Sequence, residues 1–249
     1  MGKIIVETCE IEGLKVITPA VFGDARGYFM ETYNYNDFKE AGIEQVFVQD
    51  NQSASVKNVL RGLHFQMNHP QDKLVRVISG EVFDVAVDLR QDSKTYGKWF
   101  GVVLSAENKK QFFIPKNFAH GFVVLSDYAE FAYKCTDFYH PGDEGGIAWD
   151  DPEIGVKWPL EPGLQMILSE RDKKWGGLSS KRSMAASTSP SAISSVMGAP
   201  CRMYAAFAAS NSIAVPPLIS PVVMIIFAPG ILTHEYRAAH SAAVKRSPD

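Results

Sequence analysis

Apolar and polar residues alternate along much of the first two thirds of the chain, and residues 82–89 (VFDVAVDL) show this pattern most clearly. Phe83 and Val85 fall on one face of this segment, whereas Asp84 and Asp88 fall on the other. A period of two residues is typical of a β-strand that is buried on one face. The pattern therefore predicts such a strand at 82–89.

Further short β-type segments recur about every ten residues, with turn-forming residues between them. They lie at 73–78, 99–104, 111–114, 121–125 and 129–136. The intervening Ser79-Gly80-Glu81 predicts a tight turn, and hence a hairpin between 73–78 and 82–89. Strands spaced in this way are typical of a sandwich or a barrel.

Helix is scarce in this pattern. Residues 35–41 form one candidate, for which Asn34 or Asn36 would supply the N-terminal cap. The sequence therefore predicts an all-β fold with short flanking helices.

The character of the sequence changes near Arg182. Charged, aromatic and β-branched residues are evenly mixed in 1–182, whereas Ala, Ser and Pro dominate 183–249. Such a composition is poorly suited to building a core. We expect one folded domain at 1–182 and a largely disordered tail at 183–249, with 222–228 as a candidate strand.

The composition of the chain limits the kinds of binding partner and the cellular compartment that we expect for the protein. The net charge is -3 and no basic stripe is present, which argues against nucleic-acid binding. The most apolar tract, 215–232, contains four prolines and is short for a membrane span. Three well-separated cysteines (Cys9, Cys135 and Cys201) suit neither a disulfide framework nor a zinc site. With no signal peptide visible, we expect a cytoplasmic protein without a membrane partner.

The segment 59–76 (VLRGLHFQMNHPQDKLVR) contains the closest grouping of candidate catalytic side chains. Histidine side chains ordinarily titrate near neutral pH, so His64 is a candidate general base. Lys73 can stabilise an enolate oxygen, and Arg61 suits phosphate binding. Strict alternation would place Arg61 and His64 on opposite faces. Either Gly62 kinks the strand, or Arg61 serves a neighbouring site.

Other polar side chains could complete such a site. Asp172 is a candidate partner that would fix the tautomer of His64. Tyr133 lies on the same strand face as Phe131, and it is either a core tyrosine or a proton donor opposite the imidazole. Tyr139 follows this strand and is better placed to stack on a flat ring.

A metal site is the main competing interpretation of His64 and His120. Metal-binding cupins often use a closely spaced His pair, a Glu and a later His, but position 66 here is Gln, and Lys73 would repel a cation. Catalytic metals usually take three protein ligands. Neither a phosphate-binding glycine loop nor a G-x-S-x-G motif is present. We therefore expect no catalytic metal at His64 and His120.

The chain closely resembles the dTDP-4-dehydrorhamnose 3,5-epimerase family over about residues 3–175. The matching segments are FGDARGYFME (22–31), VQDN (48–51), LRGLHFQ (60–66), KLVR (73–76), GEVFDVAVD (80–88), IP (114–115), FAHGF (118–122), YKCT (133–136) and WDDP (149–152). The resemblance implies a cupin-type jelly roll (a double-stranded β-helix). It also implies a homodimer formed by strand exchange, and inversion of carbons 3 and 5 of dTDP-4-keto-6-deoxyglucose without metal or cofactor.

The resemblance also implies roles for individual residues. His64 matches the base, Asp172 its orienting partner, Tyr133 the proton donor, and Lys73 the group facing the enolate. Tyr139 matches the ring that stacks on thymine. Further substrate contacts match Arg26, Glu31, Gln49, Asn51, Arg61, His120, Glu144 and Arg171.

Three other functions remain as alternatives. An epimerase that inverts a single carbon would use the same base and acid. A non-catalytic nucleotide-sugar-binding module would lack His64, Tyr133 or Asp172, all of which are present. A metal-dependent cupin oxygenase would need ligands that the sequence does not supply.

Overall fold

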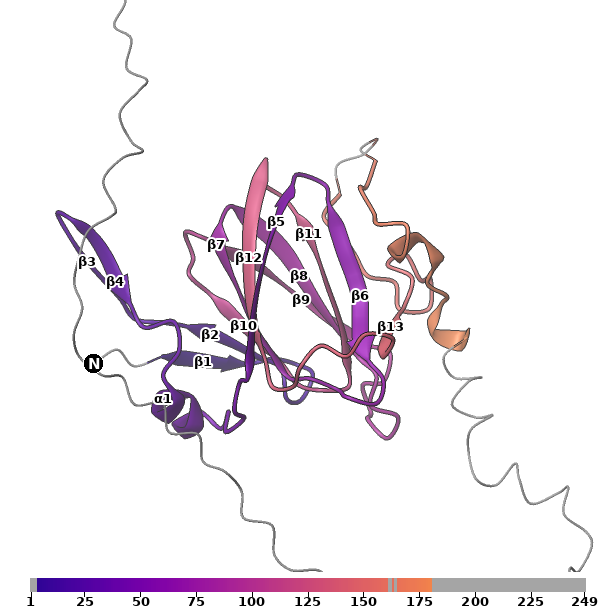
Figure 1. Cartoon of the computed structure of the whole chain (residues 1–249), viewed down its shortest axis with the longest axis horizontal. Helices are drawn as coiled ribbons and strands as arrows, with labels where there is room; N and C mark the ends of the chain where they lie inside the picture. The colour runs from indigo at the N-terminus through magenta and orange to yellow at the C-terminus, as the bar shows by residue number, and fades with distance from the viewer. Residues whose placement is uncertain (1–3, 161–162, 164, 181–249) are drawn as a thin grey trace, which may run out of the picture. The chain divides into compact units, whose positions relative to one another are not determined.

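Two antiparallel β-sheets face each other and enclose the core, as Figure 1 shows. The computed structural model describes residues 4–160, 163 and 165–180, so the predicted tail at 183–249 lies outside the described residues. The prediction of an all-β fold is confirmed.

The first sheet has six strands in the order β1-β2-β10-β7-β12-β5. They are β1 (Ile5–Thr8), β2 (Lys15–Thr18), β5 (Gln49–Val56), β7 (Lys73–Ser79), β10 (Gln111–Ile114) and β12 (Tyr128–Cys135). The second sheet has five strands in the order β13-β6-β11-β8-β9. They are β6 (Leu60–Gln66), β8 (Glu81–Asp88), β9 (Trp99–Ser105), β11 (Phe118–Val124) and β13 (Glu144–Gly146).

A separate two-stranded ribbon consists of β3 (Val21–Asp24) and β4 (Gly27–Met30). It stands apart from both larger sheets in Figure 1. Its apolar side chains are largely exposed: Phe22 to 51%, and Tyr28 and Phe29 to 58% each. A two-stranded ribbon is marginally stable alone, so this exposed apolar surface is unusual for a free element.

The predicted helix is confirmed as α1 (Tyr35–Glu40), and its cap is Asn34, whose side chain accepts a hydrogen bond from the Asn36 N–H. Phe38 on this helix is fully buried against Ile17 and Ile43. The helix therefore packs against the six-stranded sheet through Phe38.

The predicted strand at 82–89 corresponds to β8, but it is buried on both faces. Val82 and Ala86 join the core between the sheets, whereas Val85 and Val87 pack against a second cluster that includes Ile154 and other residues of the chain after β13. Because this later segment covers the outer face, both faces of β8 are largely buried, and only Glu81 and Phe83 are partly exposed. Asp84, which alternates in phase with Val82 and Ala86, is fully buried between the sheets.

The predicted hairpin between 73–78 and 82–89 is wrong. β7 pairs with β10 and β12, whereas β8 pairs with β9 and β11 in the other sheet. Gly80 makes the crossing with a φ of +76°, and a Cβ at this position would lie 2.0 Å from the carbonyl oxygen of Tyr128. Local alternation identifies both strands and the turn but not the change of sheet.

A bulge in β6 settles the orientation of Arg61 relative to His64. His64 pairs with His120 of β11, and Arg61 pairs with Phe122, so three steps along β6 match two steps along β11. The extra residue places the side chains of Arg61 and His64 on the same face of β6, which is the usual effect of a bulge. Gly62 adopts a φ of +136° there, so the predicted kink at Gly62 is confirmed.

No helix in the described part of the chain is long and apolar enough to cross a membrane.

Gly62→Ala tests whether the close approach of β6 and β11 requires glycine. A Cβ at Gly62 would lie 2.6 Å from the Cα of Gly121, and we expect a loss of about 3 kcal/mol in the free energy of unfolding from strain and overpacking. Gly142→Ala is the matched control, because Gly142 also has a positive φ but a Cβ there would meet no atom within 4 Å. We expect about 1 kcal/mol there. Equal losses in urea unfolding would contradict the packing argument.

Candidate active site

A cavity of about 710 Å³ opens between the two sheets. Eleven of the thirteen site residues expected from the sequence line it together. They are Gln49, Asn51, Arg61, His64, Lys73, His120, Tyr133, Tyr139, Glu144, Arg171 and Asp172. Most polar candidates therefore converge on one volume, although they come from distant parts of the chain.

A short hydrogen bond in the cavity joins His64 to Asp172. The Nε2 atom of His64 lies 2.5 Å from Oδ1 of Asp172, which begins the short 3₁₀ helix η1 (Asp172–Lys174). Burial alone would raise the pKa of Asp172, but the hydrogen bond and charge of His64 outweigh it and hold that pKa below its ordinary value. An ionised carboxylate can only accept, so Nε2 carries a proton, and Nδ1 is the imidazole nitrogen that remains to exchange one.

Glu144 and Arg171 form an ion pair on the other side of the imidazole. The Oε1 atom of Glu144 lies 3.8 Å from Nδ1 of His64. Glu144 is placed by β13, in which Gly146 pairs with His64. A Cβ on Gly146 would lie 2.3 Å from the Trp175 ring, whose edge-on contact with His64 spans 6.4 Å between ring centroids. Glycine at this position therefore lets Trp175 pack beside the imidazole.

Tyr133 enters the same cavity from the opposite sheet. It lies on β12, whereas His64 lies on β6, so the phenol and the imidazole belong to facing walls. Burial raises the pKa of Tyr133 above its ordinary value, which keeps the hydroxyl protonated at neutral pH. Among the residues that the structure describes, none accepts a hydrogen bond from this hydroxyl. A proton donor thus faces a potential base across the cavity.

Lys73 begins β7 and lines the same cavity. Burial lowers the pKa of its ammonium, although the neighbouring Cys135, Glu144 and Asp84 oppose this effect. Cys135 pairs with Lys73 across the ladder, and burial raises the pKa of its thiol. Within 4–160, 163 and 165–180, no carboxylate forms an ion pair with Lys73. Its charge can therefore stabilise an anion that forms in the cavity.

A second imidazole–carboxylate pair lies deeper between the sheets. The Nε2 atom of His120 lies 3.0 Å from both oxygens of the fully buried Asp84. Burial raises the pKa of Asp84, while the charge and hydrogen bond of His120 lower it. Asp84 was not identified as a site residue from the sequence. Asp84 shares a strand face with Val82 and Ala86, so its burial could have been inferred if that face had been known to point into the core.

Polar groups at the mouth of the cavity are linked to one another. Arg61 is exposed, and its Nε and Nη2 atoms each donate to the Ser55 hydroxyl at 3.1 Å. The Gln49 side chain donates to Asn51 at 3.0 Å and accepts the backbone N–H of Tyr139 at 3.0 Å. The exposed Tyr139 ring is thereby held at the rim.

Arg26 and Glu31 do not line the cavity of their own chain. Arg26 lies at the turn of the β3–β4 ribbon, where its guanidinium pairs with Asp24 at 2.5 Å. Glu31 directly follows β4. The fold of a single chain thus separates these two residues from the other eleven.

The two histidines in the cavity do not form a metal-ligand group with each other. Each already has its own carboxylate partner, Asp172 for His64 and Asp84 for His120. In the described ranges, the side-chain group with suitable ligand spacing is His69, Asp137 and His140, and none of these lines the cavity.

Comparisons with known proteins agree with this geometry. The family model for dTDP-4-dehydrorhamnose 3,5-epimerase matches residues 8–180. The chain is 59% identical over 165 residues to the dTDP-4-dehydrorhamnose 3,5-epimerase of Methanothermobacter thermautotrophicus, covering 66% of this chain and 89% of that protein. It is 56% identical over 167 residues to the Escherichia coli protein of the same name, with coverage of 66% and 89%.

Solved structures give the same result. The dTDP-6-deoxy-D-glucose-3,5-epimerase of Legionella pneumophila, in complex with dTDP-4-keto-L-rhamnose, is 51% identical with a TM-score of 0.69, and the match covers 71% of this chain and 93% of that one. ChmJ of Streptomyces bikiniensis, a 3'-monoepimerase solved with dTDP-quinovose, is 28% identical with a TM-score of 0.67, and the match covers 72% and 90%.

The fold and the cavity define a cupin-type jelly-roll isomerase that acts on a sugar nucleotide. The chain belongs to the dTDP-4-dehydrorhamnose 3,5-epimerase family.

The charge of Lys73 can be tested through the pH dependence of kcat. Because its pKa is lowered, Lys73 loses its charge at a pH below the ordinary lysine value of about 10.4, and kcat should fall on the alkaline side accordingly. Lys73→Arg keeps the charge and should move this decline to higher pH. Lys73→Met should lower kcat about a hundredfold or more at every pH. An identical alkaline decline in wild type and Lys73→Arg would remove Lys73 from this role.

Proposed function

We propose that this cavity inverts carbons 3 and 5 of dTDP-4-keto-6-deoxy-D-glucose by removing a proton at His64 and returning one from Tyr133. One observation carries the proposal: the His64–Asp172 pair and the protonated Tyr133 hydroxyl lie on facing walls of one cavity. Residues 1–182 contain every group that this reaction needs.

The first step is removal of a proton from a carbon next to the ketone. The free Nδ1 of His64 takes the proton, and Asp172 stabilises the imidazolium through Nε2–H. The electron pair left on carbon delocalises into the ketone and forms an enolate. Lys73 stabilises the enolate oxygen, which makes an otherwise weak carbon acid reactive at neutral pH.

The second step returns a proton to the opposite face of the same carbon. Tyr133 can supply it because burial keeps the phenol protonated and because it lies on the wall opposite His64. Donation from the face opposite to abstraction inverts the carbon. Repetition at the other carbon flanking the ketone completes the double epimerisation.

The cavity rim suits the nucleotide part of the substrate. Arg61 and Arg171 supply positive charge for the diphosphate, which guanidinium groups bind in a bidentate manner. Tyr139 offers an exposed ring for stacking on thymine, with Gln49 and Asn51 beside it. His120 and Glu144 provide hydrogen bonds nearer the sugar.

A second copy of the chain would complete the site. The exposed Phe22, Tyr28 and Phe29 of the ribbon need an apolar partner, and the same ribbon carries Arg26 away from its own cavity. Strand exchange in a homodimer meets both needs, since the ribbon would pair with the partner and deliver Arg26 and Glu31 to its cavity.

A single-carbon epimerase is the alternative with a specific observation behind it. ChmJ shares the fold at 28% identity and is described as a 3'-monoepimerase. A single-carbon epimerase and a double epimerase need the same base, the same acid and the same stabilisation of the enolate. The difference between the two enzymes must therefore lie in how the sugar can reorient in the cavity. Product NMR distinguishes the two, since only double inversion gives dTDP-4-keto-L-rhamnose.

Solvent deuterium incorporation separates the roles of His64 and Tyr133. We expect His64→Ala to slow deuterium incorporation at carbons 3 and 5 by about 10²–10⁴-fold, because no base remains. Tyr133→Phe should slow inversion more than proton removal, because His64 and Lys73 are intact. NMR in deuterated water measures both. Near-normal exchange in His64→Ala, or equal losses of exchange and inversion in Tyr133→Phe, would refute these assignments.

Complementation tests the strand-exchanged dimer. If Arg26 acts in the partner's cavity, a mixed dimer of His64→Ala and Arg26→Ala chains has one cavity with both defects and one intact cavity. Random refolding of equal amounts should then recover about one quarter of wild-type activity, because half of the dimers are mixed and each has one working site. Mixing His64→Ala with Tyr133→Phe is the control, since both residues come from the same chain and no intact cavity can form. Absence of recovery in the first mixture would contradict strand exchange.

A further inference from the structure

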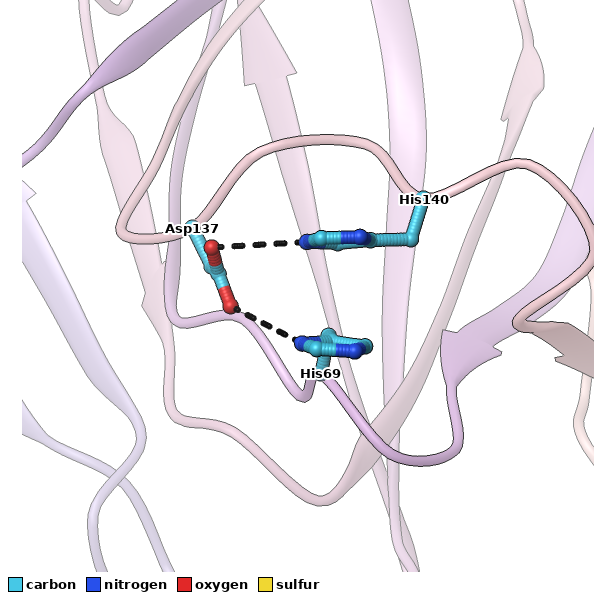
Figure 2. A group of neighbouring side chains, drawn as sticks. All are labelled: His69, Asp137 and His140. Carbon is cyan, nitrogen blue, oxygen red and sulfur yellow. Dashed lines mark ion pairs between the residues drawn. The ribbon is translucent and has the colours of Figure 1, made fainter.

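Outside the catalytic cavity, two loops bring together His69, Asp137 and His140 (Figure 2). His69 lies between β6 and β7, whereas Asp137 and His140 lie between β12 and β13. The two imidazole rings are stacked, with centroids 3.7 Å apart and planes inclined by 15°. Both rings direct a nitrogen toward the Asp137 carboxylate.

The separations in this group suit a shared ion better than direct hydrogen bonds. Nδ1 of His69 lies 3.8 Å from Oδ2 of Asp137, and Nε2 of His140 lies 3.7 Å from Oδ1. Hydrogen bonds between such atoms span about 2.7–3.2 Å. Two ligands of a tetrahedral zinc ion, each about 2.1 Å from the metal, lie about 3.4 Å apart. The observed separations exceed this value by about 0.3–0.4 Å. Because the stacked rings hold their nitrogen lone pairs nearly parallel, one imidazole must rotate about its side-chain bonds for both nitrogens to reach the same ion.

The backbone of each of the three residues is fixed by a side-chain amide. The buried Gln66 donates to the carbonyl of His69 at 2.8 Å and accepts the N–H of His140 at 2.8 Å, so one side chain ties the two loops together. Gln71 donates to the carbonyl of Asp137 at 2.7 Å. With the two loops held together in this way, only rotations of the three side chains remain to be fixed when an ion binds.

Asp143 adds a second support to the loop that carries His69. Its carboxylate accepts the backbone N–H groups of Asn68 and His69, at 3.0 Å and 2.9 Å respectively. The group is also accessible, since the side chains of His69 and Asp137 are 48% and 39% exposed. An ion can therefore enter from solvent and keep water as its remaining ligands.

We propose that His69, Asp137 and His140 bind one divalent transition-metal ion of the zinc class. Two neutral imidazoles and one carboxylate suit Zn²⁺, Co²⁺ or Ni²⁺, whereas Mg²⁺ and Ca²⁺ prefer oxygen ligands alone. The site lies outside the catalytic cavity and takes no part in proton transfer.

Co²⁺ is the probe for this site, because its visible absorption reports coordination by protein ligands. The full chain, without an affinity tag and after chelator treatment, should bind one Co²⁺ per chain at pH 7.5, and Zn²⁺ should displace it. His69→Ala and His140→Ala should each weaken binding at least tenfold and remove the protein-derived absorption band. Asp137→Asn keeps the side-chain shape but removes the charge, and should weaken binding as well.

His234→Ala/His240→Ala is the matched control, because it removes two histidines of the same chain from outside the proposed group. This variant should bind Co²⁺ like wild type, and all variants should retain epimerase activity, which shows that they are folded. The proposal is overturned if wild type shows no saturable binding. It is equally overturned if binding survives in the double variant His69→Ala/His140→Ala, or is lost in the control.

Discussion

The contact between His64 and Asp172 is the interaction on which the proposed chemistry of this protein depends. It joins residues 108 positions apart at 2.5 Å, so it exists only when the chain after β13 has folded back against β6. The hydrogen bond keeps Asp172 ionised in spite of its burial. In return the carboxylate fixes the proton on Nε2 and leaves Nδ1 able to accept one.

The sandwich architecture supplies the second requirement, which is two reactive groups on opposite sides of a small ring. Facing sheets lie about 10 Å apart, which leaves room for a sugar between side chains that point inward. His64 comes from one sheet and Tyr133 from the other. The bulge at Gly62 then places Arg61 on the same side of β6 as His64. In the proposed mechanism, inversion at carbon follows from the layering of the fold.

Much of this organisation could be predicted from the sequence. Alternation located β7, β8, β9, β10, β11 and β12 to within a few residues, because each presents an apolar face to the core. The turn at Gly80 was predicted, but its partner strands were not, since the choice between a hairpin and a change of sheet is made by tertiary packing. The burial of Asp84 escaped prediction for a similar reason: it depends on which face of β8 meets the opposite sheet, and both faces of this strand are covered.

The candidate site likewise was only partly predictable from the sequence. The residues that converge on the cavity were identified through their chemistry and through the family resemblance, whereas their contacts required the fold. The pairing of His120 with Asp84 and the bridging role of Gln66 are contacts between strands or loops, which a linear pattern does not encode. Arg26 and Glu31 were placed with the substrate by resemblance, but a single chain holds them apart from the cavity.

A crystal structure of the protein with a bound dTDP-hexose is the most direct measurement. We predict that Nδ1 of His64 lies on one face of the sugar ring, within about 3.5 Å of the carbon that loses its proton, with Asp172 still bonded to Nε2. The Tyr133 hydroxyl should lie on the opposite face. A complex in which both groups approach the same face, or in which Asp172 bonds Nδ1 instead, would contradict inversion by these two residues.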